Sequence, residues 1–110
     1  GRIRDYMGAG ALLARRRTYS DEGLGPTIER LMADTGLTYR ALADKTDLSA
    51  GYLNHIVHGN RPVPSNDVLE RLATAFDVKA EHFREYRIRV ITDKLEQMPE
   101  LIDRLYKKLG

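Results

Sequence analysis

The chain has 110 residues, of which 31% are charged, a formal net charge of +2 and no cysteine. Its length suits one compact domain with a short extension at either end, and it argues against a second independent core. The lack of cysteine excludes disulfides and cysteine-based zinc sites, and no run approaches the ~20 apolar residues of a membrane helix, so we expect a cytoplasmic protein without a targeting segment.

Positive charge is concentrated at the start of the chain. Residues 1–20 hold five arginines and one aspartate, whereas residues 27–77 hold five basic and seven acidic residues. This distribution predicts an N-terminal basic arm over residues 1–25, whose densest cluster is Arg15, Arg16 and Arg17. Charge runs of this kind are either solvated structural segments or contact surfaces.

The first expected helix begins near Pro26. Gly23 and Gly25 loosen the chain ahead of it, and Pro26 suits the first turn, where its missing N–H is no loss. We expect the helix to end at Gly36, because glycine is a common C-terminal stop. Its apolar residues at helical spacing are Ile28, Leu31 and Met32.

Two short helices joined by a tight turn follow. Thr38 is a good cap for the first, over residues 39–45, and Ser49 is a good cap for the second. Thr46–Leu48 forms the turn, and Gly59 ends the second helix. The side chains expected to face inward are Leu42, Ala43, Leu53 and Ile56.

A loop and a strongly patterned helix come next. The two prolines in Asn60–Pro64 prevent a continuous helix there, and Ser65 caps the helix that follows. Val78 and Phe83 frame a further short helix. The apolar stripe of the patterned helix comprises Val68, Leu69, Leu72, Ala73 and Phe76.

The last third of the chain fits two patterns. Tyr86–Val90 alternates as a strand does, but a lone strand would lack a partner and the wider apolar spacing fits a helix, so we expect helix. Pro99 then starts a final helix. The apolar residues of this segment either form a dimer surface or fold back on the chain's own core. They are Val90, Ile91, Leu95, Leu101, Ile102, Leu105 and Leu109.

One segment resembles the helix-turn-helix of the phage-repressor family (Cro/repressor, or XRE). It runs from Gly36 to Arg61 and reads GLTYRALADKTDLSAGYLNHIVHGNR. The resemblance covers about residues 27–83. It implies an all-α, compact lambda-repressor-like five-helix DNA-binding domain at residues 26–86, with an N-terminal basic arm and a C-terminal helical extension at residues 87–110.

The same resemblance implies a sequence-specific, double-stranded DNA-binding transcriptional regulator, associated with the nucleoid, that acts as a homodimeric repressor through recognition helix 49–58. Since Leu53 and Ile56 face inward, the opposite face should meet bases. It consists of Ser49, Ala50, Gly51, Asn54 and His55. Asn54 can pair with adenine and His55 can donate to guanine, while the small residues permit close approach. Resemblance also implies phosphate contacts from Thr38, Tyr39, Arg40, His58, Asn60 and Arg61.

Some positions depart from the family pattern. Asp47 replaces a common turn glycine, which is tolerable because aspartate visits left-handed geometry readily, and Leu48 should plug the turn beside it. Tyr39 replaces a glutamine that often grips a phosphate; its hydroxyl could do the same, or the ring could simply pack. The loop after Arg61 is one residue longer than the common form.

The same residues leave other functions open. His55 and His58 are spaced as a metal pair, but no third ligand has suitable spacing, so we expect no metal and no cofactor; these histidines and Asn54 could also be merely solvated. No set of a nucleophile, a base and an orienting group can be assembled, so we do not expect an enzyme.

The arginine cluster at residues 15–17 either enters a minor groove or is structural. The main rival is an antitoxin-like or adaptor protein that binds a protein partner through residues 87–109.

Overall fold

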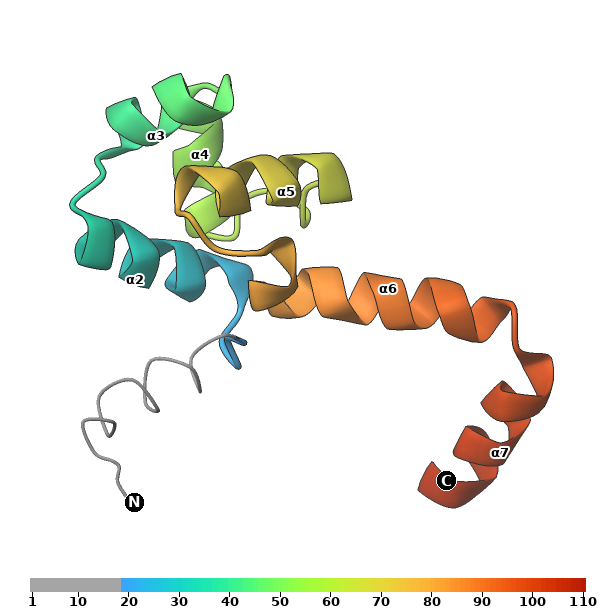
Figure 1. Ribbon diagram of the computed structural model, residues 1–110. Helices are drawn as coiled ribbons and strands as arrows, with labels where there is room; N and C mark the ends of the chain where they lie inside the picture. Colours follow the sequence, from blue (N-terminus) through green and yellow to red (C-terminus); the bar gives the residue numbers. More distant parts are fainter. Residues whose placement is uncertain (1–18) are drawn as a thin grey trace, which may run out of the picture.

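The computed structural model describes residues 19–110, which contain helices and loops but no strand (Figure 1). The elements are α2 (Leu24–Thr35), α3 (Tyr39–Thr46), α4 (Ala50–Val57), α5 (Asn66–Ala75), the 3-10 turn η1 (Ala80–His82), α6 (Arg84–Glu96) and α7 (Pro99–Leu109). The predicted all-α fold is confirmed, including helix rather than strand at Tyr86–Val90. The predicted arm cluster of Arg15, Arg16 and Arg17 lies outside the described residues.

Helices α2 to α5 and η1 pack around one hydrophobic core. α2 packs on α4, α3 packs on α4 and α5, and α5 packs on η1. The central side chains are fully buried, and each burial of this kind is worth about 1.5–3 kcal/mol. They are Ile28, Leu42, Leu53, Leu69, Leu72 and Phe83. The helical spacing of apolar residues therefore predicted the core.

Three helices begin at the hydroxyl caps that the sequence predicts. The Thr38 side chain accepts a hydrogen bond from the Ala41 N–H at 3.1 Å, and Ser49 accepts one from the Tyr52 N–H at 3.0 Å. Ser65 caps α5 in the same way, at 3.4 Å. Each bond satisfies one of the N–H groups that the first helical turn leaves without a partner.

Helix α2 begins at Leu24, two residues before its predicted start. Gly23 offers no side-chain cap, and the Leu24 N–H instead donates to Glu85 Oε2 at 2.9 Å. Glu85 lies in the first turn of α6, and its carboxylate also complements the dipole of α2. The start of α2 is thus fixed by a residue that is distant in the sequence.

Gly25 lies inside α2, where this helix crosses the end of α4. A Cβ atom at Gly25 would stand 2.2 Å from the carbonyl oxygen of Val57, which is closer than two such atoms can approach. The prediction that Gly25 loosens the chain is therefore wrong. Glycine is needed here because two backbones come into contact.

Helix α6 extends away from the core, and α7 turns back at its far end (Figure 1). α6 packs on η1 and on α7. The Cα radius of gyration is 17.1 Å, compared with about 13 Å for a compact domain of ~100 residues. The structure therefore does not fold this helix pair back over the core, which was one of the two arrangements open from the sequence. The predicted domain boundary between residues 86 and 87 falls inside α6. No change of secondary structure marks it, so this boundary stays a prediction.

Candidate nucleic-acid interface

A tight turn joins α3 to α4. Asp47 ends α3 in the left-handed region, with a φ of 60°, and the Leu48 N–H donates to the Ala43 carbonyl oxygen at 3.3 Å. Leu48 is half-buried and packs against the core. The predictions that Asp47 tolerates this geometry and that Leu48 plugs the turn are confirmed.

Helix α4 has one buried and one exposed face. Leu53 and Ile56 are 0% and 5% exposed, as predicted. The opposite face is open to solvent at all five positions predicted to meet bases, Ser49, Ala50, Gly51, Asn54 and His55. Among residues 19–110, a Cβ atom added at Gly51 would meet nothing within 4 Å, so packing within this part of the chain does not require the glycine. The exposure of this face is confirmed, and its contact with bases stays a prediction.

Tyr39 links α3 to the helices on either side. Burial, and after it the negative charge of Glu29 on α2, raises the pKa of the Tyr39 hydroxyl above its ordinary value, while a hydrogen bond with the Asn54 side chain acts in the opposite direction. The phenol is therefore protonated at neutral pH and can donate a hydrogen bond. Tyr39 is half-buried, so its ring packs while its hydroxyl stays beside the exposed face of α4.

The two histidines of α4 have different surroundings. His58 Nδ1 lies 2.8 Å from the main-chain oxygen of Asn54, which ties this ring to the end of its own helix. His55 is exposed. Within residues 19–110, no group of three or more His, Cys, Asp or Glu side chains is placed to hold a metal ion.

The loop after α4 stays close to that helix. The Asn60 N–H donates to the His55 carbonyl oxygen at 2.9 Å, and the guanidinium carbon of Arg61 lies 5.8 Å from the centre of the Tyr52 ring. This is the geometry of a cation–π interaction, and it gives Tyr52 a role that its spacing in the sequence did not reveal. The other exposed members of the predicted phosphate set are Thr38 and Arg40.

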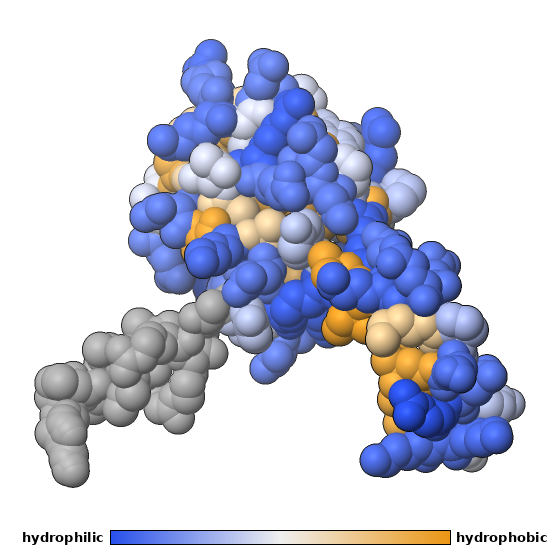
Figure 2. Space-filling view, turned by 45° about the vertical axis from the view of Figure 1, so that its right-hand side comes forward, coloured by the Kyte–Doolittle hydropathy of each residue, from blue (hydrophilic) through white to orange (hydrophobic). Residues whose placement is uncertain are grey.

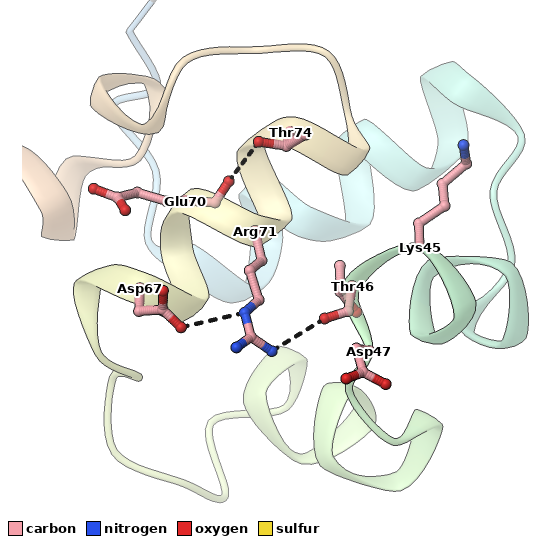
Figure 3. A pocket seen from close by; sticks show the side chains of 7 residues that line it. All are labelled: Lys45, Thr46, Asp47, Asp67, Glu70, Arg71 and Thr74. Atoms are coloured by element: carbon pink, nitrogen blue, oxygen red, sulfur yellow. Dashed lines mark hydrogen bonds and ion pairs between the residues drawn. The ribbon is translucent and has the colours of Figure 1, made fainter.

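A pocket of about 350 Å³ lies between the end of α3 and α5 (Figure 3). Arg71 reaches across it: its Nε atom is 3.2 Å from Asp67 Oδ2, and Nη1 donates to the Thr46 carbonyl oxygen at 3.4 Å. A cation at this place satisfies a carbonyl at the end of α3 and complements the helix dipole. No residue from the exposed face of α4 lines the pocket, which therefore belongs to the joint between two scaffold helices.

Comparison with known proteins identifies a family and a relative of this chain. Residues 9–86 match the family described as the helix-turn-helix domain. The chain is 40% identical over 67 residues to the HTH-type transcriptional regulator PrpR of Mycobacterium tuberculosis (strain ATCC 25618 / H37Rv), a match that covers 61% of this chain but 14% of that protein. No solved structure matches the chain, and none of the described helices is long and apolar enough to cross a membrane. Because the family match extends over most of its length, the chain belongs to the helix-turn-helix domain family.

Proposed function

We propose that the chain is a sequence-specific, double-stranded DNA-binding transcriptional regulator that places α4 in the major groove. The observation that carries this proposal is the two-sided character of α4. Leu53 and Ile56 hold the helix to the core, while Asn54 and His55 stay exposed, which is how a recognition helix reaches base edges. Membership of the helix-turn-helix family and similarity to a protein named as a transcriptional regulator support the proposal.

Asn54 and His55 are the proposed base-reading side chains. A carboxamide can pair with adenine through two hydrogen bonds, and an imidazole N–H can donate to the acceptors of guanine. The side chains at the N-terminal end of α4 are small, so its backbone can approach the floor of the groove. These residues are Ser49, Ala50 and Gly51. The Ala50 methyl group can meet a thymine methyl group.

The proposed phosphate contacts lie on two sides of α4. Thr38, Tyr39 and Arg40 stand at the start of α3, and a second group follows α4. That second group is His58, Asn60 and Arg61. Contacts of this kind fix the position of a protein on the duplex without reading its sequence, so their loss should weaken binding to all duplexes.

We also propose that the protein is a homodimeric repressor whose copies meet through α6 and α7. A dimer sets two recognition helices about 34 Å apart, one turn of DNA. Ile91, Ile102 and Leu109 are 56%, 39% and 84% exposed. Figure 2 shows hydrophobic surface along α6 and α7. Contiguous exposed apolar surface marks interaction sites. The other proposed interface residues, which are half-buried, are Val90, Leu95, Leu101 and Leu105.

The charges of α7 suit a second copy that lies antiparallel. Glu100 stands in its first turn, and Lys107 and Lys108 stand in its last. Two antiparallel α7 helices would therefore bring opposite charges together, whereas two parallel helices would bring like charges together.

Selection of binding sites from random duplexes tests the function. The whole chain is incubated with a random duplex library in excess nonspecific competitor, and bound DNA is recovered and sequenced. The proposal expects a two-fold symmetric motif with half-sites one helical turn apart. Recovery of no motif would contradict it, and transcription from a promoter that carries the motif would show whether the outcome is repression.

A protein-interaction module is the second candidate, and exposed apolar residues on α6 and α7 favour it. In that case the helix-turn-helix scaffold persists while α6 and α7 bind a different protein. Such a protein would show weak binding to every duplex, abolished by random competitor DNA, and would leave the selection without a motif.

A further inference from the structure

We infer that Arg89 of α6 positions the loop between α4 and α5, and with it Arg61, for contact with a DNA phosphate. The inference rests on the DNA-binding function proposed above. It adds a positioning residue that lies far from the recognition helix in the sequence.

Arg89 gathers three acceptors around one guanidinium group. Its Nη1 atom donates to the Pro64 carbonyl oxygen and, at 3.0 Å, to Asn66 Oδ1. Its Nη2 atom donates to the Val63 carbonyl oxygen at 3.0 Å. The planar guanidinium presents its N–H groups in a fixed fork, so these three bonds hold both the end of the loop and the start of α5 against α6.

The loop needs this external support because of its composition. Pro62 and Pro64 have no N–H and cannot donate to the main chain. The loop's own main-chain bond is made before them, from the Asn60 N–H to His55. Arg89 donates hydrogen bonds to the Val63 and Pro64 carbonyl groups. These bonds fix the end of the loop that leads into α5.

Arg61 lies between the main-chain bond of Asn60 and the carbonyl groups that Arg89 holds. The Tyr52 ring holds its guanidinium group on one side, and Val63, which Arg89 anchors, follows two residues later. Two residues of chain span at most about 7 Å, so anchoring Val63 restricts where the Arg61 backbone can lie. A side chain that is ordered before binding loses less conformational entropy when it meets a phosphate.

Double-mutant analysis of DNA binding tests the inference. The dissociation constant for the selected duplex is measured over a range of salt concentrations for the whole chain, Arg89→Met, Arg61→Ala and the double variant. We expect Arg61→Ala to lower the salt slope by about 0.9, the value of one phosphate contact. We expect Arg89→Met to weaken binding by about tenfold, within the range of coupling between linked sites.

In the Arg61→Ala background, Arg89→Met should change the dissociation constant by less than about twofold. Asn60 is fixed separately by its main-chain bond to His55, so Arg61 is the phosphate contact whose position depends on Arg89. Arg84→Met is the matched control. It removes the same charge from the same helix, but Arg84 donates to the Asp21 carbonyl oxygen and does not hold the loop. It should bind DNA as the unaltered chain does.

Asn66→Ala provides a second variant, since it removes one acceptor of Arg89 and leaves the arginine in place. It should weaken binding less than Arg89→Met does, and this loss should also vanish in the Arg61→Ala background. The inference is overturned if Arg89→Met binds like Arg84→Met, or if its effect is equally large with and without Arg61. Failure of the unaltered chain to bind any duplex would instead overturn the proposed function.

Discussion

The Asn54 side chain lies on the exposed face of α4, close to Tyr39 of α3. Its carboxamide can pair with adenine through two hydrogen bonds. Asn54→Ala should therefore cost about 1–3 kcal/mol at one base position and relax the preference there. Competition binding with duplexes that differ at a single position measures this effect.

Asn60→Ala is the companion change for this prediction. Asn60 is also exposed, but its proposed partner is a phosphate, so its loss should weaken all duplexes to the same extent. If Asn54→Ala produced the same uniform loss, the assignment of Asn54 to a base would be wrong.

At the scale of elements, the crossing of α2 over the end of α4 depends on Gly25. A methyl group at this position would overlap the Val57 carbonyl oxygen, and overpacking that forces the backbone to shift costs typically about 1–3 kcal/mol. Gly25→Ala should lower the free energy of unfolding by about this amount, as measured by chemical denaturation.

Gly51→Ala is a matched control, because it makes the same substitution inside α4, where an added Cβ atom meets nothing within 4 Å in the described part of the chain. Alanine favours a helix over glycine by up to about 1 kcal/mol, so this variant should be at least as stable as the unaltered chain. Equal stability of Gly25→Ala and the unaltered chain would show that the two helices do not meet as described.

The elements that the sequence predicts well are those set by neighbouring residues. The caps at Thr38, Ser49 and Ser65 act over three residues, and the inward side chains follow from helical spacing. The start of α2 was missed because its cap is the distant Glu85, and Gly25 was misread because its partner lies on another helix.

The candidate site follows the same division. The exposed face of α4 follows from the positions of Leu53 and Ile56, which local spacing reveals. The contacts that surround this face could not be predicted in the same way. The hydrogen bonds of Arg89 join it to residues 23 to 26 positions away, and residue spacing alone carries no signal for such pairs.

At the scale of the whole molecule, the exposed apolar residues of α6 and α7 should keep two copies together. Replacing Ile102 and Leu109 with aspartate puts charge into that surface and should convert a dimer into a monomer, because a buried unpaired charge is costly. Sedimentation equilibrium measures this change. Affinity for a two-fold symmetric duplex should fall with it, since the two halves then bind separately.

Asp103→Asn is the control for this prediction, since it changes an exposed polar residue of the same helix and adds no charge to the apolar surface. It should leave most of the protein dimeric. An unaltered chain that sediments as a monomer at every concentration, or an aspartate variant that stays dimeric, would contradict the proposed interface.

The central claim, that the exposed face of α4 reads bases, is tested most directly by nuclear magnetic resonance of the isotopically labelled whole chain titrated with the selected duplex. The account predicts that the largest amide shift changes fall at residues 49–55, with smaller changes at residues 38–40 and 58–61. Shift changes confined to α6 and α7, with α4 unchanged at saturating duplex, would contradict it.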